Sequence, residues 1–317
     1  MALFFLIAYF PAFLQLVFID ARTSDKFTLV MVSLPTKKRI AALLLAAFLL
    51  QPAQAVQSNG LYNTTAPTVS DIPNWNTGWA TPGKTGWDYV GQVNGASGVY
   101  LGNGWVITAA HVGAGTFTLN SVPYGFVSGS SHAISDVNGT ADLTLFQIST
   151  SPALNSLTLT LNDPEVKTTT NPGSQVAMIG NGGGKSWGLN TVNFTNELIT
   201  PTGYTYVSND FITVQGPFTN GGATTNNPAQ LVSGDSGGAD FIYDPVAGMW
   251  ILAGINEVAG TAMIGPGSYP ISGFVQLNTY QSQIQSLTGI SVVPEPNTYL
   301  LLGLGLLTLL LGARRRI

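Results

Sequence analysis

The chain has 317 residues, no cysteine, two histidines and a formal net charge of −4 at pH 7. Its basic residues gather near the two ends, so residues 56–293 hold three lysines, no arginine and twelve acidic residues, a net charge of −9. This acidic body lacks the basic face that nucleic-acid binding requires, which argues against that function class. A chain without cysteine forms no disulfide and offers few zinc ligands, and we expect neither a metal nor a cofactor.

The first apolar stretch covers residues 2–19 and is interrupted only by Pro11 and Gln15. No basic residue precedes it, although a secretory signal peptide begins with one. We therefore predict an apolar helix that belongs to an extension upstream of the true start, Met31. The alternative is an additional membrane segment.

The second apolar stretch is a complete signal peptide by itself. Residues 37–39 are Lys-Lys-Arg, residues 40–50 form an apolar core, and residues 53–55 read Ala-Gln-Ala, the small-residue pattern of a cleavage site. We predict that a signal peptidase cuts after Ala55. Residues 1–55 would then be an upstream extension plus a signal peptide, and the protein would be exported.

Residues 56–88 are rich in Asn, Thr, Pro and Gly and contain Trp75, Trp79 and Trp87. This composition predicts an extended N-terminal segment that packs its tryptophans on the body. A carbohydrate-binding face is the alternative use of these side chains.

From Tyr89 onward the pattern changes to short β-prone runs broken by Gly and Asn, which is typical of a sandwich or barrel. The main domain is predicted over residues 89–290, with a first barrel at about 89–165 and a second at about 172–277. The expected strands of the first barrel are 89–93, 98–101, 105–108, 116–119 and 143–148, and those of the second are 175–179, 189–194, 211–214, 238–243, 250–255 and 273–277.

After residue 277 the apolar period changes from two to between three and four. Tyr280, Ile284 and Leu287 recur at spacings of four and three, which predicts an amphipathic helix over residues 278–288. Gly289 follows as a helix stop.

The pentapeptide Gly-Asp-Ser-Gly-Gly at residues 234–238 is the most informative motif. Its glycines permit strained backbone angles and close approach where a substrate carbonyl must sit. A serine hydroxyl is a weak nucleophile at neutral pH and needs an adjacent base. Ser236 is therefore a candidate nucleophile, although Gly, Asp and Ser also favour ordinary turns.

Two further motifs supply a candidate base and a candidate acid. Residues 108–111 read Thr-Ala-Ala-His, and residues 141–146 read Ala-Asp-Leu-Thr-Leu-Phe. Histidine has the unperturbed pKa nearest to neutrality, and a carboxylate can fix its tautomer. We expect His111 to shuttle the proton and Asp142 to orient His111.

The chain also offers a rival base, His132, and a rival acid, Asp136. His132 lacks the Thr-Ala-Ala-His context, and Asp136 lies in a loop-like Ser-Asp-Val-Asn-Gly run. We expect a surface position for His132 and a turn role for Asp136.

In the order His111, Asp142, Ser236, the three motifs resemble those of chymotrypsin/trypsin-like serine proteases, peptidase family S1. The resemblance implies an all-β fold of two six-stranded antiparallel β-barrels with a short C-terminal helix, and a cleft between the barrels that takes a polypeptide substrate. It implies a serine endopeptidase acting through an acyl-enzyme intermediate. The backbone N–H groups of Gly234 and Ser236 would form the oxyanion hole.

The same resemblance places the base of the specificity pocket six residues before the nucleophile, at Gln230. A carboxylate is absent from that position, so a preference for Lys or Arg is not supported. Glu257 is a second pocket candidate and would change that conclusion. We expect a neutral residue before the scissile bond.

In the digestive branch of the family, cleavage frees a new N-terminus that pairs with the Asp before the serine, here Asp235. Residues 90–93, Val-Gly-Gln-Val, stand where that branch has its activation sequence, but no Arg precedes them. Signal cleavage would leave the terminus at Val56, far upstream. Asp235 is therefore expected to find another partner, unless a further processing step exists or the site needs no switch.

The C-terminal residues 291–317 contain Pro-Glu-Pro at 294–296, an apolar run at 299–313 and three arginines at 314–316. Together these features resemble a PEP-CTERM sorting signal. The resemblance implies handling by an exosortase, transient membrane anchoring and then release to the cell surface or extracellular matrix of a bacterium. A plain membrane anchor is the alternative.

Two other functions remain open from the sequence. One is a catalytically silent surface or matrix binding protein on a protease fold, which would not need all three triad residues. The other is an esterase that uses the same triad and would turn over esters without cleaving peptides.

Overall fold

The computed structural model describes residues 4–10, 13–19, 30–33, 55–160, 162–220 and 222–290. It divides the chain into two units, Met1–Pro52 and Ala53–Ile317. Residues 40–50 and 291–317, on which the predicted signal-peptide core and sorting signal fall, lie outside the described residues. Within the described ranges, no helix is long and apolar enough to cross a membrane.

The first unit contains strands where we expected an apolar helix. β1 (Phe4–Phe10), β2 (Phe13–Ile19) and β3 (Val30–Ser33) form one antiparallel sheet. The helix prediction for residues 2–19 is therefore wrong over the described part. Aromatic and β-branched residues favour strands, and Pro11 interrupts a helix but fits the turn between two strands.

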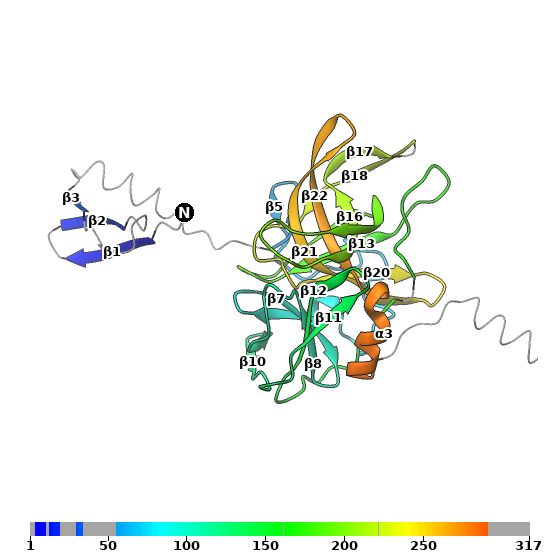
Figure 1. Cartoon of the computed structure of the whole chain (residues 1–317), viewed down its shortest axis with the longest axis horizontal. Helices are drawn as coiled ribbons and strands as arrows, with labels where there is room; N and C mark the ends of the chain where they lie inside the picture. Colours follow the sequence, from blue (N-terminus) through cyan, green and yellow to red (C-terminus); the bar gives the residue numbers. More distant parts are fainter. Residues whose placement is uncertain are drawn as a thin grey trace, which may run out of the picture. The chain divides into compact units, whose positions relative to one another are not determined.

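The second unit begins its main body with a seven-stranded antiparallel sheet in the order β10-β9-β6-β7-β8-β12-β11 (Figure 1). Its strands are β6 (Val90–Val93), β7 (Ala96–Gly102), β8 (Trp105–Thr108), β9 (Phe117–Leu119), β10 (Val122–Tyr124), β11 (His132–Asp136) and β12 (Gly139–Gln147). Thr108 of β8 faces Thr144 of β12. Continued past Thr108, this register brings residues 109–111 level with residues 141–143.

A second seven-stranded antiparallel sheet follows in the order β14-β13-β20-β21-β22-β16-β15. Its strands are β13 (Gln175–Gly180), β14 (Ser186–Thr191), β15 (Phe194–Ile199), β16 (Ser208–Val214), β20 (Ala239–Asp244), β21 (Met249–Ile264) and β22 (Gly267–Gln276). Two small sheets flank it: the hairpin of β17 (Gly216–Asn220) and β18 (Ala223–Asn227), and the trio β19 (Ala229–Gln230), β4 (Gln57–Ser58) and β5 (Leu61–Tyr62). The trio pairs the first residues after Val56 with the segment that leads to Ser236.

The all-β, chymotrypsin-like prediction is confirmed, but each sheet holds seven strands rather than six. The additional strand β10 arises because Asn120 and Ser121 both have positive φ, 49° and 66°, and reverse the chain directly after β9. A two-residue turn of that hand matches the twist of antiparallel strands. Asn-Ser is a weaker hairpin signal than Asn-Gly, so the sequence did not reveal it.

The C-terminal helix forms as predicted. α3 (Leu277–Thr288) buries Tyr280 and Ile284, and it lies beside β11 of the first sheet (Figure 1). Gly289 ends it with φ 68° and donates its N–H to the carbonyl of Gln285. Because α3 follows β22 of the second sheet, it joins the two halves of the body.

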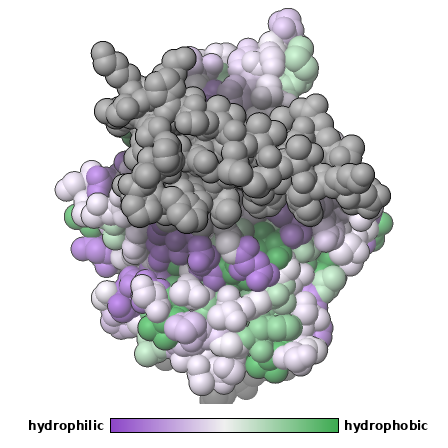
Figure 2. Space-filling view, turned by 90° about the vertical axis from the view of Figure 1, so that its left-hand side faces the viewer, coloured by the Kyte–Doolittle hydropathy of each residue, from purple (hydrophilic) through white to green (hydrophobic). Residues whose placement is uncertain are grey.

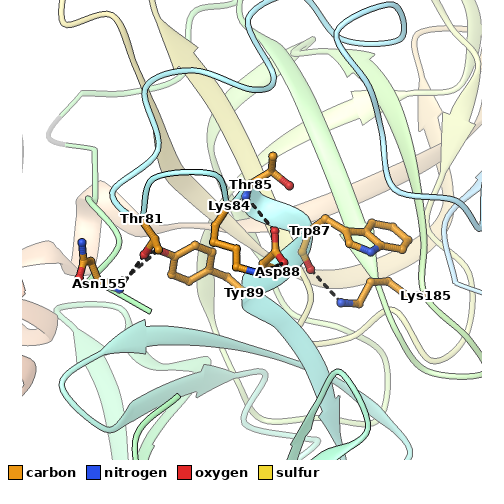
Figure 3. A network of polar contacts seen from close by, with 8 residues as sticks. All are labelled: Thr81, Lys84, Thr85, Trp87, Asp88, Tyr89, Asn155 and Lys185. Carbon is orange, nitrogen blue, oxygen red and sulfur yellow. Dashed lines mark hydrogen bonds and ion pairs between the residues drawn. The ribbon is translucent and has the colours of Figure 1, made fainter. Parts of the chain in front are cut away.

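The segment before the first sheet includes the short helix α2 (Gly86–Tyr89). It makes hydrogen bonds to loops of both sheets, as Figure 3 shows. Thr81 Oγ1 lies 2.7 Å from the Tyr89 hydroxyl and accepts the N–H of Asn155 at 2.7 Å. Lys185 donates to the carbonyl of Trp87 at 2.8 Å and stands 4.9 Å from its ring. Burial lowers the pKa of Lys185 to about 8.

The tryptophans of this segment enter the core. Trp75 is fully buried and packs edge-on against Trp79 and Trp250, with ring centroids 4.9 Å away in both cases.

On the face drawn in Figure 2, hydrophilic and hydrophobic side chains are interspersed wherever the described residues are visible. Charged residues make up only 8% of the chain.

Candidate active site

His111 and Asp142 meet through two hydrogen bonds. His111 lies in the turn after β8, and its backbone N–H donates to Asp142 Oδ1 at 2.8 Å. Its ring atom Nδ1 lies 2.5 Å from Asp142 Oδ2. Asp142 is fully buried, while 16% of the His111 side chain is exposed. The carboxylate therefore fixes both the position and the tautomer of the imidazole, and leaves Nε2 free for a second partner.

The charges around this pair favour the protonated form of His111. Burial acts to lower the pKa of His111, but the hydrogen bond and charge of Asp142, together with the charge of Glu257, outweigh it and hold that pKa above its usual value. A base of this kind can accept a proton from a hydroxyl near neutral pH.

Ser208 and Glu257 form a second set of polar contacts that holds Asp142 in place. The backbone N–H of Asp142 donates to Ser208 Oγ at 2.9 Å, and the Ser208 hydroxyl donates to Glu257 Oε1 at 2.9 Å. Glu257 is the bulge residue between the paired positions 256 and 258 of β21, which turns its side chain inward. Burial raises the pKa of Glu257 to about 7, and burial with the neighbouring Glu257 charge raises that of Asp210 well above its usual value.

Ser236 lies in the loop between β19 and β20, which is shaped by glycines. Gly234 and Gly237 have φ of 98° and 81°. A Cβ on Gly237 would stand 2.1 Å from Thr108 Oγ1 and 2.3 Å from the carbonyl oxygen of Ser97. Only glycine allows this approach, and it brings the residue after Ser236 against the strand end that leads to His111.

Ser97 connects the loop to both sheets, although in the sequence it looks like any serine in a β-prone run. Its N–H donates to the carbonyl of Ser236 at 2.9 Å, and its hydroxyl donates to that of Gly234 at 3.1 Å. Its hydroxyl oxygen accepts the N–H of Asn181 at 2.7 Å, and its carbonyl accepts the Thr108 hydroxyl at 2.7 Å. Ser97 is fully buried, so these bonds hold the serine loop in register with the histidine turn.

The backbone N–H groups of Gly234 and Ser236 donate to no partner within residues 55–290 as described. Donors without a partner in the protein are what an oxyanion hole requires. In the same part of the chain, no hydrogen bond joins Ser236 Oγ to His111. Such contacts are often long in proteases without substrate and shorten in the reacting complex.

Asp235 has a partner in Val56, which lies far upstream in the sequence. Its Oδ1 accepts the backbone N–H of Val56 at 2.9 Å, and its Oδ2 accepts that of Val232 at 2.6 Å. Burial raises the pKa of Asp235 to about 7, against the effect of these two bonds. The expectation that Asp235 needs a partner other than Val56 is therefore wrong. Residues 57–62 fold back as β4 and β5 beside β19, and this places Val56 next to Asp235.

Comparison with known proteins decides the family. A sequence model of the trypsin family matches residues 77–282. This chain belongs to the trypsin family. A PEP-CTERM protein-sorting motif matches residues 292–316, which indicates export and transient anchoring at the C-terminus. No curated protein matches this trypsin-family chain.

Three solved structures that are similar to this trypsin-family chain share little of its sequence. An inactive mutant of the murine norovirus NS6 protease is 12% identical, with a TM-score of 0.38 over 62% of this chain and 93% of its own. The MamO protease domain of Magnetospirillum magneticum is 20% identical, with a TM-score of 0.33 over 59% and 87%. The passenger domain of the plasmid-encoded toxin of enteroaggregative Escherichia coli is 15% identical, with a TM-score of 0.42 over 65% and 23%.

The two pocket candidates of the trypsin-family domain both make polar contacts within the protein, although Gln230 is only partly buried. Gln230 Nε2 donates to Gln57 Oε1 at 3.0 Å, across the β19–β4 pair. Glu257 is only 5% exposed and accepts a hydrogen bond from the Ser208 hydroxyl. Its carboxyl group therefore faces the residues that hold Asp142 and does not line an open pocket.

The rival residues are placed apart from the His111–Asp142 pair. His132 is exposed at the start of β11, with its ring 5.8 Å from that of Trp105. Asp136 ends the same strand and accepts the N–H of Asn138 at 2.7 Å, as a turn residue does. Among the residues that the structure describes, no group of three or more His, Cys, Asp or Glu side chains is arranged to hold a metal ion.

Tyr204 is a site residue that the sequence analysis missed. Its ring centroid lies 5.1 Å from that of His111, and the Tyr206 ring stacks beyond it at 6.0 Å. Tyr204 is 47% exposed and belongs to the loop between β15 and β16. A Gly-Tyr-Thr-Tyr run has no periodic signal, so only the folded chain shows that it covers the histidine.

Proposed function

We propose that this trypsin-family chain is an exported serine endopeptidase that hydrolyses peptide bonds through Ser236, His111 and Asp142. The two-point contact between His111 and Asp142 is the observation that carries the proposal. The packing of Gly237 against Thr108 supports it, because it places the serine loop beside the histidine turn.

In the proposed reaction, Ser236 Oγ attacks the substrate carbonyl while His111 Nε2 takes up the hydroxyl proton. The oxyanion receives hydrogen bonds from the N–H groups of Gly234 and Ser236. His111 then gives its proton to the leaving amine, and an acyl-enzyme remains on Ser236. A water molecule, activated by His111 in turn, releases the acid product and restores the serine.

Asp142, Ser208 and Glu257 would act behind the reacting atoms as positioning residues. Asp142 stabilises the imidazolium that forms, and the Ser208–Glu257 bond holds the Asp142 backbone. The charge of Glu257 also favours protonated His111. This arrangement gives Glu257 a role in tuning the base instead of selecting the substrate.

A neutral residue is proposed before the scissile bond. Gln230 is uncharged, and Glu257 is buried in a contact with Ser208, so neither presents a free carboxylate to a Lys or Arg side chain. In the proposed mature protein, residues 56–88 precede the protease domain at 89–290, and residues 291–317 would be handled by an exosortase-type enzyme at the cell envelope.

A peptide library and a matched ester substrate test this function. We expect the exported protein to cleave internal peptide bonds after neutral residues, and Ser236→Ala to remove about 10⁶-fold of kcat. Ester turnover without peptide cleavage would indicate an esterase. A folded wild type with neither activity would favour a binding protein, and a profile dominated by Lys or Arg would contradict the proposed specificity.

A further inference from the structure

Two buried carboxyl groups, those of Glu257 and Asp210, lie next to each other behind Asp142. Asp210 follows Ser208 by two positions in β16. Side chains alternate along a strand, so Asp210 is on the same face of β16 as the hydroxyl that bonds Glu257 Oε1. A Cβ on Gly273 would stand 2.9 Å from Asp210 Oδ2. The glycine therefore leaves the space that the Asp210 carboxyl group occupies.

Three of the four oxygens of these two groups lack an N–H or hydroxyl donor. Ser208 donates to Glu257 Oε1, but Glu257 Oε2 and both oxygens of Asp210 receive no such bond from the residues that the structure describes. In the same part of the chain, no cationic side chain forms an ion pair with either group. Two adjacent carboxylates would repel each other in a place where water solvates neither. At least one of them must therefore hold a proton.

The surroundings favour a proton on Asp210. Burial, then the charge of Glu257 and a hydrogen bond with it, raise the pKa of Asp210 well above its usual value. Burial raises the pKa of Glu257 only to about 7, because the same hydrogen bond, the Ser208 hydroxyl and the charge of His111 act to lower it. Glu257 is therefore the member of the pair that ionises first as the pH rises.

Four other titratable groups act on this pair from the elements packed around it. Asp142 of β12 and Asp240 of β20 are fully buried, and their charges raise the pKa of Asp210 further. Tyr280 of α3 has a pKa raised chiefly by burial, so its hydroxyl stays neutral. The fourth group is His111, whose positive charge lowers the pKa of the glutamate. These neighbours leave the proton on the aspartic acid and the negative charge on the group that faces the histidine.

We propose that Asp210 is a positioning residue of the site: its carboxyl group stays protonated and donates a hydrogen bond to Glu257 Oε2, so that Glu257 can carry the negative charge that faces His111. The proposal rests on the proposed function. Asp210 keeps its proton throughout the reaction and touches neither the substrate nor the reacting atoms. Without this donor, Glu257 would itself hold a proton near neutral pH, and the pKa of His111 would fall.

A charged Glu257 would serve the proposed reaction in two ways. His111 becomes positive when it takes the proton of Ser236, and a second negative charge near Asp142 lowers the free energy of that state. A carboxylate also accepts a stronger hydrogen bond from the Ser208 hydroxyl than a neutral acid does. The oxygen of that hydroxyl accepts the backbone N–H of Asp142, so the stronger bond holds Asp142 more firmly.

Titration of the His111 ring by NMR tests the proposal without relying on catalysis. The chain has two histidines, so His132→Gln identifies the His111 signals. The exported full chain is compared in four forms: the wild type, Asp210→Asn, Asp210→Leu and Asp240→Asn. An asparagine amide can donate to Glu257 as the acid does, whereas leucine has a similar size and cannot donate. Asp240 is the control, an equally buried acid that faces Asp235 instead.

We expect His111 to titrate at the same pH in the wild type, Asp210→Asn and Asp240→Asn. In Asp210→Leu its midpoint should be about one pH unit lower, a tenfold weaker hold on the proton. The acidic limb of kcat/KM should move by the same amount. Glu257→Gln should lower the midpoint similarly, and adding Asp210→Leu to it should change little more, because both variants remove the same charge.

An unchanged His111 midpoint in Asp210→Leu, or an equal fall in Asp210→Asn, would overturn the proposal. If Asp210→Leu does not fold, infrared spectroscopy decides. The wild-type spectrum minus that of Asp210→Asn at pH 8 should contain the C=O band of a protonated carboxyl group, and its absence would refute the proposal. If no form cleaves peptides, the proposed function fails, whereas the His111 titration still decides on Asp210.

Discussion

The two halves of the candidate site are built in different ways. The His111–Asp142 half depends on one strand pairing: the β8–β12 register brings the two residues level, and two direct bonds join them. The Ser236 half is a glycine-rich loop whose shape depends on distant groups, with Ser97 on one side and Val56, 179 positions before Asp235, on the other.

The difference shows which half depends on distant parts of the chain. The His111–Asp142 pair is set by one strand pairing, whereas the serine loop also depends on a backbone group 179 positions before Asp235. Variants in each half show whether the two halves respond separately.

Asp142→Asn should have the largest effect on the histidine half. An amide has one acceptor oxygen and no charge, so it cannot take both hydrogen bonds from His111 or stabilise an imidazolium as a carboxylate does, and kcat/KM should fall about 10⁴-fold with little change in the fold. Steady-state kinetics on a neutral peptide measures it. Asp136→Asn, the rival acid, is the control and should retain wild-type activity; an equal loss there would refute the assignment.

Gly237→Ala should damage the serine half. The added Cβ would meet Thr108 Oγ1 and the Ser97 carbonyl, so the loop must move, with about a 10²-fold loss in kcat/KM and about 2–3 kcal/mol in the free energy of unfolding. Gly129→Ala is the matched control, because Gly129 has the same φ of 81° and an added Cβ meets nothing within 4 Å. If both variants behave alike, backbone strain and not the close approach explains the loss.

Glu257→Gln should change the pH dependence more than the maximum rate. The glutamine can still accept the Ser208 hydroxyl, but it removes a charge that raises the pKa of His111. The acidic limb of kcat/KM should therefore move to lower pH, with less than about a tenfold loss on the plateau. Glu197→Gln, on the surface, should leave the limb in place. An unmoved limb in Glu257→Gln would show that this charge does not reach the histidine.

The pH dependence of stability should show the smallest effect. Burial raises the pKa of Glu257 to about 7, and those of Asp210 and Asp240 well above their usual values. The folded protein therefore keeps protons that the unfolded chain releases above about pH 4. Its stability should fall as the pH rises towards 7, and less steeply in Glu257→Gln. Urea midpoints at pH 5 and pH 8 measure it, and a midpoint that rises with pH would contradict the assignment.

The parts of the molecule that follow from short-range pattern could be predicted from the sequence. Strand β8 has the predicted bounds, α3 begins one residue before the predicted helix, and Gly289 ends it. The His111–Asp142 contact followed from the resemblance of the motifs, in the order His111, Asp142, Ser236, to those of the trypsin family. The strand and helix bounds depend on periodicity and capping, which are local.

What the sequence could not reveal depends on contacts between distant segments. Val56 reaches Asp235 only because the chain folds back as β4 and β5, and a buried serine such as Ser97 looks the same as any strand serine. Glu257 needed the β21 bulge to turn inward. The prediction of a helix at residues 2–19 was wrong for another reason: apolar composition alone does not distinguish a helix from a strand.

The most direct measurement is intact-mass and peptide mapping of the exported protein after reaction with a fluorophosphonate. The account predicts one label per mature chain, located on Ser236, with none on Ser236→Ala and strongly reduced labelling on His111→Ala. A folded mature protein that takes no label, or takes it on another residue, would contradict the account.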